Sequence, residues 1–88
     1  MDEATFRQMA RQRGYGEPRT KRYPPDSTSD LHTHELECLV LVLEGDFILA
    51  TESGSTRYSA GETCTLPAAT RHAEGAGAEG ASILVATR

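Results

Sequence analysis

The stretch from Asp30 to Asp46 reads DLHTHELECLVLVLEGD, and it decides the fold of this chain of 88 residues. In an extended chain, side chains two residues apart lie on the same face. One face therefore carries two imidazoles, a thiol and apolar groups, at His32, His34, Leu36, Cys38, Val40 and Val42. The other face is apolar as well, at Leu39, Leu41 and Leu43. Apolar side chains on both faces are typical of a strand covered on both sides, so we predict a buried strand with metal-ligand chemistry at its mouth.

Short runs of strand-forming residues, separated by turn residues, make up most of the remaining chain. We predict that Gly45-Asp46 forms a tight turn and that residues 47–51 form a second strand, paired with the first as a hairpin. Residues 75–80 are small and are expected to be a connection. Further strands are expected at residues 19–23, 56–59, 63–66 and 81–86, with another that begins at His72. Roughly seven or eight short strands at even spacing predict an all-β sandwich or small barrel.

The first part of the chain is expected to be a helix and an arm. Apolar residues recur at helical spacing within residues 1–13. We therefore divide the chain into an N-terminal helix and arm, residues 1–23, and a barrel, residues 24–88. The apolar outer face at residues 39–43 must be covered, and we predict a homodimer that packs sheet on sheet. The arm is then either exchanged between subunits or folded onto its own barrel.

Charge is unevenly distributed along the chain, although the formal net charge is only -4. Residues 1–22 hold six of the nine Lys and Arg against three acidic residues, while the remaining residues hold three against ten. An acidic body argues against a nucleic-acid partner, and the basic arm lacks the interleaved aromatics of a single-strand groove. The chain has no apolar run of about 18 residues and no signal-peptide pattern, so we expect a soluble, cytoplasmic protein with no membrane partner.

The three histidines of the chain are placed in a way that indicates a metal site. His32 and His34 share one face of the predicted strand, and His72 from a neighbouring strand can complete a facial triad with positions left for water or substrate. Cys38 lies on the same face, and as a thiolate it could be a fourth ligand, which favours zinc, copper or iron over magnesium or calcium. The alternatives are a solvent-exposed histidine pair and, for Cys38 as for Cys64, a small buried apolar residue.

These residues fall into a pattern that resembles the two sequence motifs of the cupin family. The first motif runs Gly-x5-His-x-His-x3,4-Glu-x6-Gly, and the chain matches it at His32, His34 and Gly45. The second motif runs Gly-x5-Pro-x-Gly-x2-His-x3-Asn, and the chain matches it at Gly61, Pro67 and His72. Four motif positions hold other residues, namely Asp26 and Ala69 in place of Gly, Cys38 in place of Glu, and Ala76 in place of Asn.

The resemblance implies a small antiparallel jelly-roll β-barrel with one divalent metal ion in its mouth. The implied ligands are His32, His34 and His72, and Cys38 stands at the position of the fourth. Glu37 is the neighbouring carboxylate, but alternation turns it to the opposite face of the strand. It could replace the missing ligand only if a bulge shifted the register.

Two functions are compatible with such a centre. The first is a metal-dependent enzyme that acts on a small organic molecule, similar to cupin dioxygenases, isomerases or decarboxylases, with zinc, iron, manganese, nickel or copper as the metal. The second is a non-catalytic cupin that binds or senses a metal or small ligand, and a barrel without metal is a third reading. Tyr58 and Arg71 are the candidates for polar groups that face a substrate, although an exposed Arg beside a turn is more often a solvated charge. The expected apolar pocket is lined by Leu36, Val40, Val42, Phe47 and Leu66.

Overall fold

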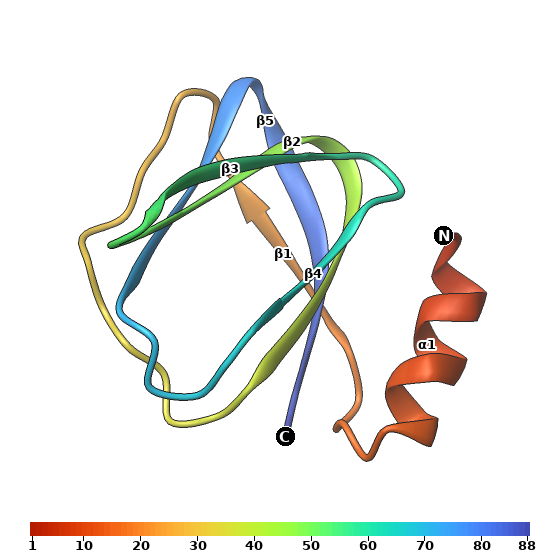
Figure 1. The fold of residues 1–88 in the computed structure, drawn as a ribbon. Coiled ribbons are helices and arrows are strands. Elements are labelled where there is room, and N and C mark those ends of the chain that lie inside the picture. Colours follow the sequence, from red (N-terminus) through yellow and green to blue (C-terminus); the bar gives the residue numbers. More distant parts are fainter.

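The computed structural model describes all residues, 1–88, and consists mainly of antiparallel strands (Figure 1). The elements are α1 (Glu3–Gln12), β1 (Arg19–Tyr23), β2 (Cys38–Thr51), β3 (Gly54–Ser59), β4 (Thr63–Leu66) and β5 (His72–Thr87). The predictions of an N-terminal helix and of strands at 19–23 and 63–66 are confirmed. No helix is long and apolar enough to cross a membrane.

Two long strands, β2 and β5, organise the sheet by pairing with each other along two separate stretches. Residues 38–45 of β2 pair with 81–87 of β5, and residues 47–51 pair with 72–76. The register shifts between these stretches, where both strands bend sharply (Figure 1). The shorter strands extend each half, because β4 pairs with the first half of β2, β3 with its second half, and β1 with the second half of β5. The chain thereby folds over on itself and encloses an interior.

The prediction of a hairpin at Gly45-Asp46 is wrong. Residues 38–51 form one continuous strand, whose two halves pair with β5 and not with each other. Gly45 has a φ of +73°, and a Cβ built on it would lie 2.0 Å from the carbonyl oxygen of Gly80. This glycine allows the backbones of β2 and β5 to approach closely at a bulge, so that the strand bends without ending.

The predicted connection at residues 75–80 is also wrong, because these residues belong to β5. Gly75 and Ala76 pair with the second half of β2, and the register then passes to Ala81. Residues 77–80 therefore form the bend of one long strand, and the structure has five strands where the sequence predicted about seven or eight. Local sequence does not distinguish a bend of this kind from a turn, since Gly and Ala are compatible with both.

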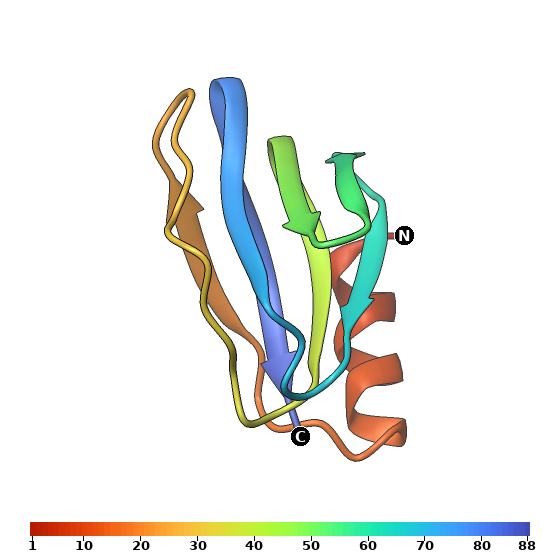
Figure 2. The ribbon, with the colours of Figure 1, turned by 60° about the vertical axis from the view of Figure 1, so that its left-hand side comes forward.

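The alternation along β2 separates two apolar clusters, as the sequence predicted. The inner cluster includes Val40, Val42, Phe47, Leu49 and Ile83. On the outer face, residues of β2 and β5 pack against residues of α1 and Tyr15; this cluster consists of Phe6, Ala10, Tyr15, Leu39, Leu41, Leu84 and Ala86. Figure 2 shows α1 lying outside the strands.

The helix α1 covers the outer face within one chain. It begins after Asp2, whose carboxylate accepts a hydrogen bond of 2.8 Å from the amide of Thr5. β1, which the sequence analysis assigned to the arm, pairs with β5 along its whole length and belongs to the sheet. The apolar face that motivated the prediction of a homodimer is therefore already covered, and the homodimer stays a prediction.

Candidate metal centre

The backbone brings the three histidines to one end of the interior. His32 lies in the loop before β2, and His72 begins β5; the amide of each donates to the carbonyl of the other, at 2.8 and 2.9 Å. The carbonyl of His34 accepts a hydrogen bond of 2.8 Å from the amide of Ala69. The loops that carry the histidines are thus fixed by backbone hydrogen bonds on both sides.

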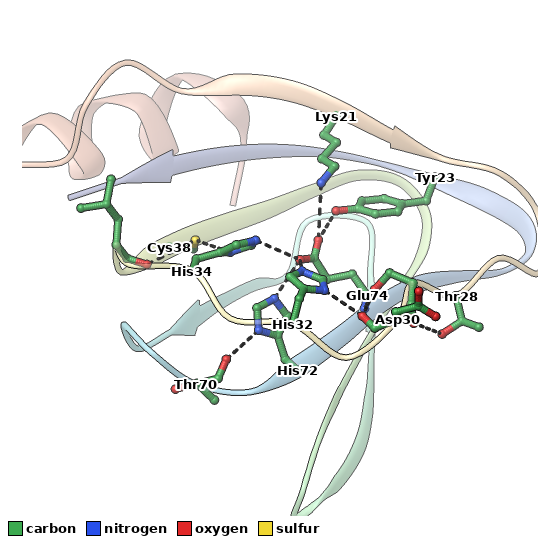
Figure 3. A network of polar contacts seen from close by, with 12 residues as sticks. Lys21, Tyr23, Thr28, Asp30, His32, His34, Cys38, Thr70, His72 and Glu74 are labelled. Carbon is green, nitrogen blue, oxygen red and sulfur yellow. Dashed lines mark hydrogen bonds and ion pairs between the residues drawn. The ribbon is translucent and has the colours of Figure 1, made fainter.

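Glu74 joins the histidines as a fourth donor. His32, His34, His72 and Glu74 each offer one ligand atom, and these atoms all lie within 4.8 Å of one another. Oε1 of Glu74 is 2.8 Å from Nε2 of His72, 3.1 Å from Nε2 of His32 and 3.9 Å from Nε2 of His34 (Figure 3). Three imidazole nitrogens and one carboxylate oxygen therefore converge on a single point, close enough to hold one metal ion.

The outer edges of two imidazole rings fix which ring nitrogen faces this point. Nδ1 of His32 lies 2.8 Å from the carbonyl oxygen of Asp30, and Nδ1 of His72 lies 2.8 Å from that of Thr70. A carbonyl only accepts, so each Nδ1 carries a proton and Nε2 is the nitrogen that faces Glu74. This Nε2 donates a hydrogen bond to the carboxylate when the ring is protonated and offers a lone pair when the ring is neutral. With neutral rings, the imidazole nitrogens and the carboxylate present several acceptors to one point, which a metal cation can bridge.

The pKa shifts of Glu74 and His34 also favour the binding of a cation. Burial alone would raise the pKa of Glu74, but hydrogen bonds with Tyr23 and His72 and the nearby charge of Lys21 lower it to about 2. Burial lowers the pKa of His34, with the neighbouring histidines acting in the same direction. A charged carboxylate and neutral imidazoles are the forms that bind metal.

The structure places Cys38 beside His34. Its Sγ lies 3.8 Å from Nδ1 of His34, the ring nitrogen on the edge away from Glu74 (Figure 3). Cys38 is not one of the four converging donors. Burial raises the pKa of Cys38 and raises that of Cys64 to about 12, so both are thiols at neutral pH.

Glu74 was not predicted as a ligand, although the sequence holds a signal for it. Residues two apart on a strand share a face, so the strand that begins at His72 turns Glu74 towards the same side. The motif comparison drew attention instead to position 38, where cupins carry Glu. Glu37 points away from the centre, as expected from alternation. Its carboxylate accepts a hydrogen bond from the hydroxyl of Tyr15 and forms an ion pair of 3.1 Å with Arg88.

A cavity of about 500 Å3 lies next to this centre, within the interior. Its lining includes His34 and Glu74. Most of the rest is apolar, with Tyr23, Leu36, Cys38, Val40, Phe47, Leu49, Cys64, Leu66, Ile83 and Val85. Tyr58 and Arg71, the candidates for substrate-facing polar groups, line a different surface depression and do not border this cavity.

Comparison with known proteins places the architecture among solved structures. No protein-family model matches the sequence, and no curated protein matches it. A cupin-2 domain containing protein from Shewanella frigidimarina is similar with a TM-score of 0.72 and 20% identity, over 82% of this chain and 70% of that one.

Two enzymes have similar structures. The polyketide cyclase RemF from Streptomyces resistomycificus has a TM-score of 0.71 and 22% identity, over 83% of this chain and 54% of its own. The DMSP lyase DddQ from Ruegeria pomeroyi has a TM-score of 0.74 and 20% identity, over 82% of this chain and 37% of its own. The chain therefore spans about half or less of the length of these two enzymes. At such low identity the likeness shows the fold alone, and we conclude that the chain has the cupin fold.

Proposed function

We propose that this protein binds one divalent transition metal through His32, His34, His72 and Glu74. The observation that carries the proposal is the convergence of three Nε2 atoms on one carboxylate oxygen, with two of the rings oriented by backbone carbonyls. Imidazole and carboxylate ligands suit zinc, iron, manganese, nickel and copper. The metal would act as a Lewis acid or an oxygen-activating centre, at the end of a largely apolar cavity.

We assign Cys38 a supporting role in this centre. Its sulfur contacts the edge of the His34 ring that carries Nδ1, where it can accept a weak hydrogen bond and steady the ring. Ligation by the Cys38 thiolate, which the sequence analysis considered, would require the sulfur to reach the other edge of the ring. The two roles are separated by the metal content of a Cys38 variant.

The favoured function is that of a metal-dependent enzyme acting on a small organic molecule. Four ligands leave positions open on a metal that prefers higher coordination, and the cavity beside them is of a size typical for small-molecule sites. Two proteins of similar fold carry the names of a cyclase and a lyase, which supports an enzyme. A reaction of dioxygenase or isomerase type fits these features.

A non-catalytic binding or sensing role is the second candidate. It is favoured by the scarcity of free acid-base groups along the cavity, because the Tyr23 hydroxyl is engaged by Glu74 and both cysteines are protonated. Turnover of a small molecule by the loaded protein would decide for the enzyme. Metal binding without turnover of any tested carbonyl compound would favour the second role.

Elemental analysis by mass spectrometry tests the metal centre. We expect about one metal ion per chain in untagged wild-type protein purified without chelator, and large losses in Glu74→Gln and His34→Ala. Glu37→Gln is the matched control, since it removes a neighbouring carboxylate on the opposite face and should keep the metal. Cys38→Ala should keep it too. An unchanged metal content in Glu74→Gln would contradict the proposed ligand set.

A further inference from the structure

The strand β1 forms a polar wall of the cavity beside the metal centre. Alternation places Arg19, Lys21 and Tyr23 on one face, and all three line the cavity. Thr20 and Arg22 are on the opposite face and do not line it. The chain therefore sends two of the three cationic side chains of this strand towards the cavity.

Lys21 and Arg19 differ in whether their charge is already paired with a carboxylate. Nζ of Lys21 lies 3.8 Å from Oε2 of Glu74, so its charge is shared with the metal centre (Figure 3). Arg19 forms none of the ion pairs in the structure. Glu35 also borders the cavity but pairs with neither cation. Arg19 is thus an exposed, unpaired guanidinium that borders the cavity, able to bind a carboxylate through two parallel hydrogen bonds.

The surface next to Arg19 is apolar. Arg19 lies directly opposite Val85 in the ladder between β1 and β5, and Val85 lines the cavity together with Ile83 and Val40. Cys64, whose thiol is protonated, behaves as an apolar group on the same lining. A ligand that reaches from Arg19 towards Glu74 therefore meets apolar side chains of the cavity lining.

We propose that the cavity binds a small organic acid with an apolar body, and that Arg19 recognises its carboxylate. The body lies against Val40, Ile83 and Val85, and Lys21 adds positive potential between the carboxylate and the metal centre. The proposal names the ligand class of the proposed metal site and in that sense rests on it. Arg19 is a specificity residue in this account, because it contacts the ligand far from the reacting end.

Ligand-observed NMR titration of metal-loaded protein tests this recognition. Hexanoate and benzoate are the probes, and hexanamide and benzamide are their uncharged counterparts. We expect both acids to bind more tightly than their amides. Arg19→Gln should lower the affinity for the acids by about tenfold and leave the affinity for the amides unchanged. Arg22→Gln is the matched control, since it removes the same charge from the other face of the same strand.

Arg19→Glu extends the test by reversing the charge at an exposed position that the fold does not need. It should abolish saturable binding of both acids without lowering the thermal midpoint. Equal affinity for acid and amide, the absence of saturable acid binding, or equal effects of Arg19→Gln and Arg22→Gln would overturn the proposal.

Repeating the titration after chelator treatment separates this proposal from the proposed metal function. Acid binding that depends on Arg19 but not on metal, in a protein that never takes up metal, would remove the metal function and leave the recognition by Arg19 standing. Acid binding that is lost with the metal and is unchanged in Arg19→Gln would keep the metal function and overturn recognition by Arg19, because the carboxylate would then be a metal ligand.

Discussion

The inner and outer faces of β2 carry the same kind of apolar residue, but one face lines a cavity and the other packs against a helix. On the outer face, Leu39 and Leu41 are 2% and 1% exposed and pack against Phe6 of the helix. On the inner face, Cys38, Val40 and Leu49 are also buried, yet they border a cavity next to the four side chains that could hold a metal ion. One strand thus stabilises the fold with one face and forms the site with the other, so that changes on the two faces should separate stability from binding.

Removal of the helix anchor should have the largest effect on stability. Phe6 is fully buried between α1 and the sheet. We expect Phe6→Ala to lower the free energy of unfolding by about 3 to 5 kcal/mol, measured by urea denaturation of metal-free protein. Where the variant stays folded, its metal content should equal that of the wild type. A loss of metal from folded Phe6→Ala protein would show that the two faces are not separable.

A pair of identical substitutions sharpens the comparison. Leu41→Ala on the outer face should cost about 3 kcal/mol, because the truncated side chain leaves a new void in a closed cluster. Leu49→Ala should cost less, since Leu49 already borders a cavity and is 8% exposed. Urea denaturation of the two metal-free variants measures both values. Equal costs would mean that the inner face is packed as tightly as the outer one.

Metal loading should stabilise the protein through the inner face alone. At a free metal concentration about 100 times the dissociation constant, the gain in free energy of unfolding is about 2.7 kcal/mol. Calorimetry should show this as a higher thermal midpoint for loaded than for stripped wild-type protein. The difference should disappear in His72→Ala and persist in Leu41→Ala, provided that both variants fold.

The smallest expected effect lies in the loops that carry the histidines. Ala69 has a φ of +62° and Asp26 a φ of +53°, and both stand where the cupin motifs have Gly. Ala69→Gly should stabilise the protein by about 0.5 to 1 kcal/mol in urea denaturation, because Gly adopts this conformation without steric cost. Asp26→Gly should gain less, since Asp tolerates positive φ better than Ala does. A loss of stability in Ala69→Gly would contradict this explanation.

The two-faced strand and the three histidines could be predicted because both depend on short-range periodicity. The alternation of residues 38–43 predicts which side chains join the inner cluster and which join the outer one. The spacing of His32, His34 and His72 predicts that three imidazoles come together. The motif spacing also predicted the fold, although two of the motif glycines are replaced. Positive φ at Asp26 and Ala69 shows that the backbone keeps the motif conformation in spite of these replacements.

The bends of the long strands and the fourth donor were not predicted. The contact between Gly45 and Gly80 joins positions far apart in the chain, and a local pattern holds no information about it. Glu74 was within reach of the alternation rule but was overlooked because the motif places its carboxylate at position 38. The covering of the outer face by α1 was one of two arrangements that the sequence left open, and a homodimer still awaits measurement of the mass in solution.

The position of β1 at the edge of the sheet affects which residues of this protein can be substituted without loss of the fold. β1 is an edge strand with β5 as its one neighbour, while the proposed metal ligands come from β5 and from the loop before β2. Arg19 is exposed and forms no ion pair, so its substitution should disturb the sheet little. The proposed ligand preference at Arg19 can therefore diversify without change to the proposed metal ligands, and engineered variation in ligand choice should start at this position.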